Sequence, residues 1–298
     1  MAEPLHFGFN DEAAISNSFQ NQSKLPAHEL REKAMQEFNN AVDLLRSFGV
    51  EISIIQGDEN VVVPDAVFPN NWISTHETGQ LILYPMAVSN RRAERRMDIV
   101  EGLVQREGYE IIDLSHHERQ NPPEFLEGTG SLIFDHDAKL VYAAISPRTH
   151  QSLVERVASL IGYKAVCFKA FGIAGELIYH TNVMMCVGET FVIIGNKTVD
   201  SQDWPRLKQA IVNSGKALIR LSNDQVYHHF AGNMLLVANT KNERLLVLSA
   251  SARKSLTQEQ EAQLLHHNDH LVTLEIPTIE FVGGGSARCM LAEVRSKE

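Results

Sequence analysis

The sequence predicts one α/β domain in which five similar units, each of about fifty residues, close into a ring. Three observations support this prediction. The same order of elements, two short strands, a helix and a third strand, recurs along the chain. A further copy is divided between the two ends of the chain. Because a unit of this size cannot bury its sheet and helix alone, the copies are expected to stack around one axis.

Four units lie within the chain, and they begin at about Asn70, Gly128, His180 and Ala231. Each opens with two short β-rich runs bounded by Gly, Asn or Asp, which is typical of strands. Apolar residues at helical spacing follow, and they predict helices over 92–107, 148–161, 202–214 and 257–266. Each unit is expected to end in another strand, at 109–114, 164–169, 217–221 and 271–276.

The fifth unit combines the two ends of the chain. Gly285 to Val294 is expected to supply its first strand, while residues 5–9, a helix over 27–48 and a strand at 51–55 supply the rest. Chain ends that complete one unit predict a closed ring, so we treat residues 1–298 as a single catalytic domain. Residues 10–25, rich in Asn, Gln and Ser, are a candidate lid or rim loop.

Composition favours a globular protein with a small-molecule partner. The 298 residues are 44% apolar and 21% charged, and the net charge of -10 with scattered basic residues argues against a nucleic-acid partner. No apolar run is long enough for a membrane span, and the first residues lack a secretion-signal pattern. The three cysteines form no CxxC pair, so neither a disulfide framework nor a zinc site is expected. We therefore expect a cytoplasmic protein, and the sequence leaves a homo-oligomer open.

A glycine-rich stretch near the C-terminus delivers the candidate nucleophile. Gly283, Gly284 and Gly285 allow positive φ and close approach to a ligand, and Cys289 follows them. A thiolate attacks carbon far better than a thiol, so this reading requires an electropositive setting, with which adjacent Arg288 is compatible. The alternative is a buried structural cysteine, because free cysteines are often buried.

A ring of equivalent units would bring the beginnings of the five first strands to one end of its axis. These positions carry 65–71, Glu127, His180, Asn233 and Cys289. A carboxylate, an imidazole and a thiol gathered in this way form the combination used for covalent catalysis at an electrophilic carbon.

Six short motifs, in chain order, carry a family resemblance: FGFN at 7–10 with NSFQ at 17–20, PDAVFPNNW at 64–72, LEGTGS at 126–131, SPRT at 146–149, HTN at 180–182 and ARC at 287–289. With the repeat, they resemble the guanidino-group-modifying superfamily of arginine deiminases, dimethylarginine hydrolases and amidinotransferases. The match is closest to the CtlX-type citrulline hydrolase branch and extends over nearly the whole chain. The resemblance implies a five-bladed α/β propeller, the pentein fold, and chemistry that needs no cofactor or metal.

The resemblance also implies a role for each catalytic candidate. Cys289 would be the nucleophile. His180 would protonate the leaving amine and then activate water. Glu127 would bind the substrate nitrogen and steady the charge changes beside His180.

Four further positions match substrate-binding residues of the superfamily. Asp65 would hold the α-amino end of the substrate, and Phe68 would pack on its planar group. Arg148 would grip the α-carboxylate, a task that suits the guanidinium fork. Arg92, at the matching place in the preceding unit, would be a second clamp.

Two departures from the superfamily pattern bear on the substrate. Members that act on arginine commonly hold the guanidinium cation between two aspartates, and both positions are asparagine here, Asn71 and Asn182. A buried cation without opposing charge is costly, whereas a neutral ureido group needs both donors and acceptors, which carboxamides provide. The replacements favour citrulline over arginine.

The predicted reaction is attack of Cys289 on the ureido carbon, departure of ornithine, and hydrolysis of an S-carbamoyl intermediate to carbon dioxide and ammonia. Three alternatives remain open at this point. One is hydrolysis of arginine or a methylated arginine, and another is amidino transfer to a second amine. The third, from a different class, is a non-catalytic binding protein on the same fold.

Overall fold

Four three-stranded sheets of one topology make up the regular strands of residues 1–297, the part of the chain that this computed structural model describes. The first strand of each sheet is antiparallel to the second, and the second is parallel to the third. The sheets contain β1 (Ile73–Thr75), β2 (Gln80–Leu83) and β3 (Glu110–Asp113); β4 (Ile133–Asp135), β5 (Leu140–Ala144) and β6 (Lys164–Phe168); β7 (Met185–Val187), β8 (Phe191–Ile194) and β9 (Ala217–Arg220); and β10 (Leu235–Ala238), β11 (Arg244–Ser249) and β12 (His270–Leu274). The repeating unit predicted from the sequence is therefore confirmed four times.

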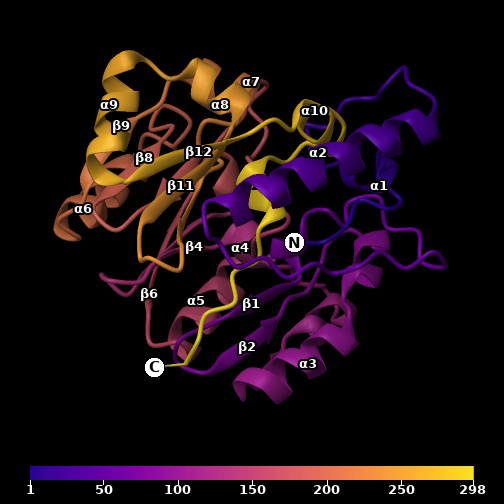
Figure 1. Cartoon of the computed structure of the whole chain (residues 1–298). Helices are drawn as coiled ribbons and strands as arrows, with labels where there is room; N and C mark the ends of the chain where they lie inside the picture. The colour runs from indigo at the N-terminus through magenta and orange to yellow at the C-terminus, as the bar shows by residue number, and fades with distance from the viewer. Residues whose placement is uncertain (298) are drawn as a thin grey trace.

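A helix connects the second and third strands of each sheet. A parallel pair cannot be joined by a tight turn, so the chain must cross back over the sheet. The connecting helices are α3 (Met97–Glu107), α5 (Gln151–Leu160), α6 (Trp204–Asn213) and α9 (Gln258–His267), and α3, α6 and α9 lie at the periphery in Figure 1. The helix predicted over 92–107 begins later than expected, because Asn90–Glu94 forms a separate 3₁₀ turn, η2.

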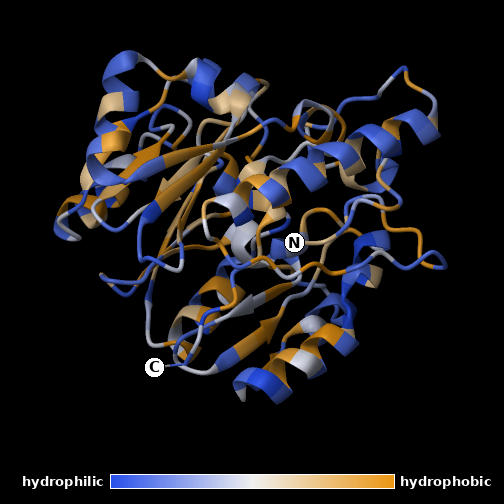
Figure 2. Ribbon diagram, viewed as in Figure 1, coloured by the Kyte–Doolittle hydropathy of each residue, from blue (hydrophilic) through white to orange (hydrophobic). Residues whose placement is uncertain are grey.

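Local sequence explains where these helices begin and end. Thr257 and Gln260 form a capping box at the start of α9. Gly108 ends α3 with a φ of 70°, a conformation that favours glycine. The longest helix, α2 (Ala27–Ser47), buries one face that includes Phe38 and Leu45. Hydrophilic and hydrophobic residues alternate along α2 in Figure 2, as expected for a helix with one face in the core.

Short helical turns, and not strands, occupy the first positions of three units. Pro69–Asn71 forms η1, Gly128–Ser131 forms α4, and Thr181–Val183 forms η4, so the strands predicted from Asn70, Gly128 and His180 begin a few residues later. The fourth unit has a hydrogen-bonded turn at the same place, in which Asn233 N donates to Phe230 O at 2.8 Å. Short polar side chains compete for backbone hydrogen bonds and so favour turns at these positions.

The fifth unit contains its predicted helix, α2, but lacks regular strands. A single parallel bridge between Ala2 and Ile55 replaces the predicted strands at 5–9 and 51–55. The predicted strand 285–294 contains the 3₁₀ turn η5 (Ala287–Met290) and then an irregular segment. That segment is held by a side chain, because Thr75 Oγ1 donates to Glu293 O at 3.0 Å and accepts from Arg295 N at 2.9 Å. A side-chain partner of this kind cannot be read from strand propensity.

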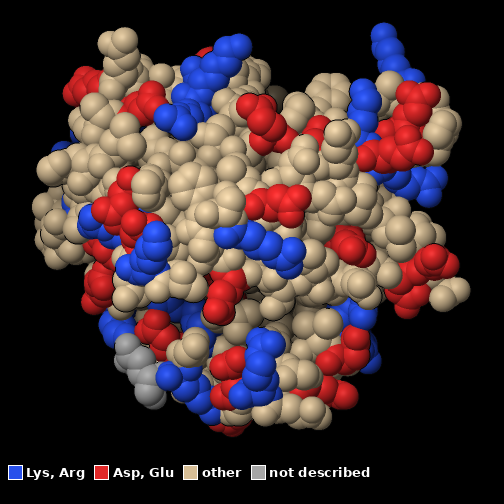
Figure 3. Space-filling model, in the orientation of Figure 1, with Lys and Arg blue, Asp and Glu red and all other residues tan. Residues whose placement is uncertain are grey.

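The remaining elements are short: α1 (Asp11–Ala14), α7 (Asn223–His229), α8 (Ala250–Ser255), α10 (Pro277–Gly283) and η3 (Ser115–Arg119). The C-terminal segment, yellow in Figure 1, passes through the centre of the molecule close to the N-terminus. Acidic and basic side chains are interspersed over the face seen in Figure 3. Within residues 1–297, no helix combines the length and apolar character needed to cross a membrane.

Candidate active site

A buried imidazole–carboxylate pair lies at the centre of the candidate site. Glu127 directly precedes α4 and His180 directly precedes η4, so equivalent turns of two neighbouring units position them. His180 Nε2 lies 2.7 Å from Glu127 Oε2, and the relative exposures of the two residues are 2% and 0%. Ala87 N donates to the other oxygen of Glu127 at 3.0 Å. Both oxygens of the carboxylate are therefore held by hydrogen bonds, and the carboxylate orients the imidazole.

The charges around this pair keep the glutamate ionised and the histidine neutral. Burial acts to raise the pKa of Glu127, but Arg148 and the hydrogen bond from His180 outweigh it and hold this pKa well below its ordinary value. Burial lowers the pKa of His180 to about 4, although Glu127 acts in the opposite direction. At neutral pH the imidazole therefore donates from Nε2 to the carboxylate, and Nδ1 is its basic nitrogen.

Gly130, in α4, allows the histidine and the first unit to approach each other. A Cβ on Gly130 would lie 2.8 Å from His180 Nδ1 and 2.3 Å from Asn71 Nδ2. Both distances are shorter than van der Waals contact, so a side chain at this position would displace the site. Close packing thus explains the second glycine of the LEGTGS motif, Gly130.

Cys289 lies in η5 with two carboxamides directed at its sulfur. Asn182 Nδ2 is 3.2 Å from Sγ, and Asn233 Nδ2 is 3.3 Å from it. Amide N–H donors suit a sulfur anion, whereas a carboxylate at either position would repel one. The chain therefore brings the thiol to the same turns as His180, because Asn182 and His180 flank Thr181. Cys289 is 5% exposed.

The two asparagines that replace aspartates differ in their partners. Asn71 Oδ1 accepts from Arg91 Nη1 at 3.0 Å, and its Nδ2 lies 3.4 Å from Glu127 O. Asn182 uses its nitrogen for the sulfur of Cys289, while its Oδ1 is buried without a hydrogen-bond partner. Asn71 is thus oriented by the protein, whereas the amide oxygen of Asn182 has no partner among residues 1–297.

Nearly the whole chain matches one known protein family. The family model is described as N,N dimethylarginine dimethylhydrolase, eukaryotic, and the match covers residues 3–296. The chain belongs to this family. Its fold is the α/β propeller of the guanidino-modifying pentein superfamily, as its solved neighbours also indicate. No curated protein sequence matches the chain.

Several solved structures are similar to most or all of this dimethylhydrolase-family chain. Apo ArgZ, an arginine dihydrolase from the ornithine–ammonia cycle in cyanobacteria, has a TM-score of 0.75 at 15% identity, covering 100% of this chain and 40% of that chain. The N-terminal domain of ArgZ, with a cysteine-to-serine mutation and bound to substrate, has a TM-score of 0.73 at 16% identity, with 100% and 97% covered. A dimethylarginine dimethylaminohydrolase adduct has a TM-score of 0.60 at 18% identity, with 87% and 90% covered. This chain thus spans 40% of the length of intact ArgZ.

Asp65 and Phe68 lie close to the candidate active site of this dimethylhydrolase-family protein. Asp65 accepts from Asn10 Nδ2 at 2.8 Å and lies 3.8 Å from Arg91 Nε. Burial raises the pKa of this carboxyl group, against the effects of Arg91 and Asn10. The Phe68 ring packs against the glycine loop, since a Cβ on Gly283 would lie 2.7 Å from it. The ring therefore leaves no room for a side chain at Gly283 or Gly285.

Arg148 joins the catalytic centre to the segment 10–20. Its guanidinium lies 3.4 Å from Glu127 Oε2 and 4.9 Å from the centre of the Tyr179 ring. It also donates to Ser16 Oγ at 2.7 Å and to Ala13 O at 2.9 Å. The candidate lid segment of the sequence analysis therefore contacts the site directly. Its further contacts run from Asn17 to Gly284 O and from Gln20 to Gly283 O.

Of the two adjacent arginines in η2, Arg91 faces the candidate site, whereas Arg92, the predicted second clamp, contacts Met86 and Glu118. Arg92 donates to Met86 O at 2.9 Å, and its side chain is 30% exposed and lies 3.4 Å from Glu118. Arg91, 4% exposed, contacts Asn71 and Asp65 and pairs with Glu94 at 2.7 Å. In a 3₁₀ turn, successive residues point in different directions, so only one of two adjacent arginines faces the site.

Several supporting side chains around the candidate site were not predicted from the sequence. Asn10 and Gln20 bind Asp65, and Tyr179 donates to Gly284 O at 2.8 Å. Asn10 and Gln20 were visible only as ends of the FGFN and NSFQ motifs, and Tyr179 stands next to the HTN motif. Their polar contacts depend on loops that meet in space from distant parts of the chain.

Proposed function

We propose that this protein hydrolyses the ureido group of free citrulline to ornithine, carbon dioxide and ammonia. Family membership supports a hydrolase of guanidino or related groups. The observation that carries the citrulline proposal is the unpaired Oδ1 of Asn182, beside the sulfur of Cys289. A neutral amide oxygen can accept from a ureido N–H but gives a guanidinium no opposing charge.

The contacts of Arg91 also favour citrulline over arginine as the substrate. Its guanidinium is buried and donates to Asn71, at one of the positions where relatives acting on arginine commonly carry an aspartate. A substrate cation near Asn71 would therefore meet a neutral amide in place of a carboxylate, while the charge of Arg91 is already balanced by Glu94. A neutral ureido group does not need that missing opposite charge.

The proposed reaction has two steps, with Cys289 as nucleophile and His180 as acid and base. The sulfur attacks the ureido carbon, and the thiol proton passes through the imidazole to the leaving nitrogen as its bond to carbon breaks. Ornithine departs and leaves an S-carbamoyl group on the cysteine. His180 then takes a proton from water, which displaces the sulfur and forms carbamic acid. This product decays to carbon dioxide and ammonia, while Glu127 holds the imidazole in place.

We assign the amino-acid end of the substrate to two charged residues of the candidate site, Asp65 and Arg148. Asp65 would bind the α-ammonium group, and Phe68 would pack on the planar ureido group. Arg148 would bind the α-carboxylate, replacing the oxygens of Ser16 and Ala13 as acceptors. Arg91, rather than Arg92, is the candidate for the second clamp.

A second candidate is an arginine dihydrolase. It is favoured by the neighbours named ArgZ, which match the full length of this chain. Such an enzyme would hydrolyse the guanidino carbon of arginine twice and release ornithine. It would use the same cysteine and histidine, so the substrate accepted first distinguishes it from a citrulline hydrolase.

The decisive experiment incubates the protein separately with citrulline, arginine and dimethylarginine, followed by amino-acid analysis. Ornithine from citrulline, with little turnover of arginine, is expected. Efficient conversion of arginine would instead support the dihydrolase, and consumption of an added acceptor amine would indicate amidino transfer. Mass spectrometry of quenched enzyme should show a carbamoyl adduct on Cys289, and Cys289→Ser should abolish turnover. A protein that binds citrulline and turns over none of these substrates would contradict the proposal.

A further inference from the structure

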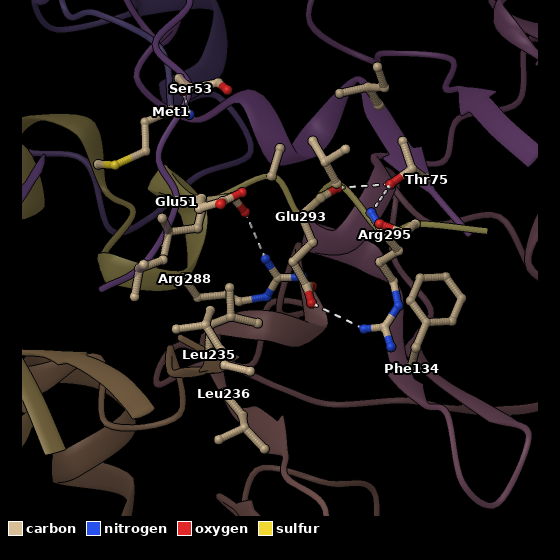
Figure 4. Close-up of a pocket in the computed structure, with 18 of the residues that line it drawn as sticks. Met1, Glu51, Ser53, Thr75, Phe134, Leu235, Leu236, Arg288, Glu293 and Arg295 are labelled. Atoms are coloured by element: carbon tan, nitrogen blue, oxygen red, sulfur yellow. Dashed lines mark hydrogen bonds and ion pairs between the residues drawn. The ribbon is translucent and has the colours of Figure 1, made fainter. Parts of the chain in front are cut away.

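A cavity of about 1120 Å³ lies apart from His180 and Glu127. Residues of the first strand of each sheet line it, for example Thr75, Phe134 and Val237. None of Glu127, His180 and Cys289 lines it. Figure 4 shows this cavity, which is separate from the site described above.

Arg288 gives the cavity a buried cation with unused donors. The residue is 5% exposed and directs its guanidinium into the cavity (Figure 4). Nη1 donates to Leu291 O at 2.9 Å, and the nearest carboxylate, of Glu293, lies 3.7 Å from Nη2. A guanidinium has five N–H groups, so within residues 1–297 most of the Arg288 donors have no acceptor. A buried guanidinium in this state can bind a carboxylate with two parallel hydrogen bonds.

The same cavity has an acidic group and an apolar wall. Glu51 lines it, and among residues 1–297 no basic side chain lies within ion-pair distance of this carboxylate. Leu235 and Leu236, on β10, lie below Arg288 in Figure 4 and form part of the wall. Leu236 is only partly buried although it belongs to a regular strand. An apolar surface left open inside a cavity favours an apolar ligand group.

We propose that this cavity binds a free α-amino acid with an apolar side chain. Arg288 binds its carboxylate, Glu51 binds its ammonium group, and Leu235 and Leu236 contact its side chain. Each requirement comes from a different lining group, and together they describe a zwitterion with an apolar substituent. The proposal concerns the cavity alone and does not depend on citrulline turnover.

A ligand in this cavity would affect the candidate nucleophile, Cys289, through the neighbouring residue Arg288. Arg288 and Cys289 are adjacent in η5, and they face the cavity and the catalytic turns respectively. Arg288 N donates to Asn233 Oδ1 at 3.0 Å, and Asn233 also contacts the sulfur. A ligand on Arg288 therefore changes the setting of Cys289 if it moves η5.

Isothermal titration of the intact protein with L-leucine tests the proposal. Binding should be saturable, should persist in excess citrulline, and should be lost with leucinamide, which has no carboxylate. Arg288→Gln and Leu236→Trp should each weaken binding about tenfold or more, the first by removing the anion partner and the second by filling the cavity. Leu236→Trp also covers the case in which Arg288→Gln fails to fold.

Matched controls come from the rim and the outer surface. Arg106→Gln changes an exposed arginine that lines the same cavity, and Leu265→Trp adds the same bulk to an exposed position on α9. Both variants should bind leucine as the unaltered protein does. Absence of saturable binding would overturn the proposal. Binding that excess citrulline displaces, or that Leu236→Trp leaves unchanged, would also overturn it, because the ligand would then occupy another site.

Discussion

Asn182 donates from Nδ2 to the sulfur of Cys289 at 3.2 Å, and within residues 1–297 its amide oxygen has no hydrogen-bond partner. One carboxamide therefore directs its donor at the proposed nucleophile, and its acceptor is left for a substrate in the proposed reaction. An aspartate at this position would place a negative charge against the sulfur but would provide an anion for a substrate cation. The choice between Asn and Asp at position 182 therefore affects both the ionisation of the Cys289 sulfur and the charge of the substrate that the site favours.

The first prediction concerns Asn182→Asp. A carboxylate within about 3 Å of the sulfur should oppose a thiolate, so kcat/KM for citrulline should fall roughly 100-fold. The ratio of arginine to citrulline turnover should rise, because the new charge favours a guanidinium. Steady-state kinetics with both substrates would measure this. The exposed Asn213→Asp variant should leave both rates unchanged, and an unaltered substrate ratio in Asn182→Asp would refute the assignment.

Gly130→Ala should damage the site through steric contact. The new Cβ would lie 2.3 Å from Asn71 Nδ2 and 2.8 Å from His180 Nδ1. We expect kcat to fall at least about tenfold and the protein to lose about 1–3 kcal/mol of stability. Gly102→Ala is the matched control in α3, where a Cβ would meet nothing within 4 Å. It should retain activity and gain about 0.5–1 kcal/mol in urea unfolding.

The adjacent arginines of η2 allow a comparison of site and surface. Arg91→Gln removes the donor to Asn71 and the partner of Asp65, so kcat/KM for citrulline should fall about 100-fold. Arg92→Gln changes a side chain that is 30% exposed and should reduce kcat/KM no more than about threefold. The reverse order of effects would restore the original expectation for Arg92.

Loss of Arg91 also leaves Glu94 as a buried unpaired carboxylate. Burial already raises the pKa of Glu94 to about 7 despite the guanidinium. The double variant Arg91→Gln with Glu94→Gln removes this penalty. It should recover stability in urea unfolding without recovering activity, which separates binding from folding.

The repeating pattern explains how much of the fold was predictable. Four units were readable because each has its own apolar strands and amphipathic helix, as in α5. The fifth was misread, since its C-terminal segment is held by Thr75 and not by a strand ladder. Apolar content between Met290 and Val294 resembles a strand, and only the tertiary contacts show otherwise.

Part of the candidate site could be proposed where residue type suggests a chemical role. Cys289, His180 and Glu127 were proposed from their order in the repeats; the structure places Glu127 beside His180 and the sulfur of Cys289 beside Asn182, and their catalytic roles stay a prediction. The choice between Arg91 and Arg92 depends on the phase of a 3₁₀ turn, which neighbouring arginines do not reveal. Asn10 and Gln20 reach Asp65 from positions far away in the sequence, and no local pattern encodes such contacts.

The last prediction is a dependence of stability on pH that arises from His180. Its pKa falls from 6.5 to about 4 on folding, because burial disfavours the charged imidazole. Between these pH values the unfolded chain binds a proton at this residue and the folded chain does not, so stability must decrease as the pH falls through this range. The contribution is on the order of 3 kcal/mol. The lowered pKa of Glu127 adds a loss in the same direction at still lower pH.

Urea unfolding of the unaltered protein and of His180→Asn between pH 7 and pH 4 isolates this contribution. The difference in unfolding free energy between the two proteins should change with pH between 7 and about 5, because the variant lacks the titrating imidazole. Glu127, whose pKa also depends on His180, titrates mainly below this range. His228→Asn, at an exposed position of α7, should follow the unaltered protein. Parallel curves for His180→Asn and the unaltered protein would mean that this histidine keeps an ordinary pKa. The neutral imidazole required at the start of the proposed reaction would then lose its physical basis.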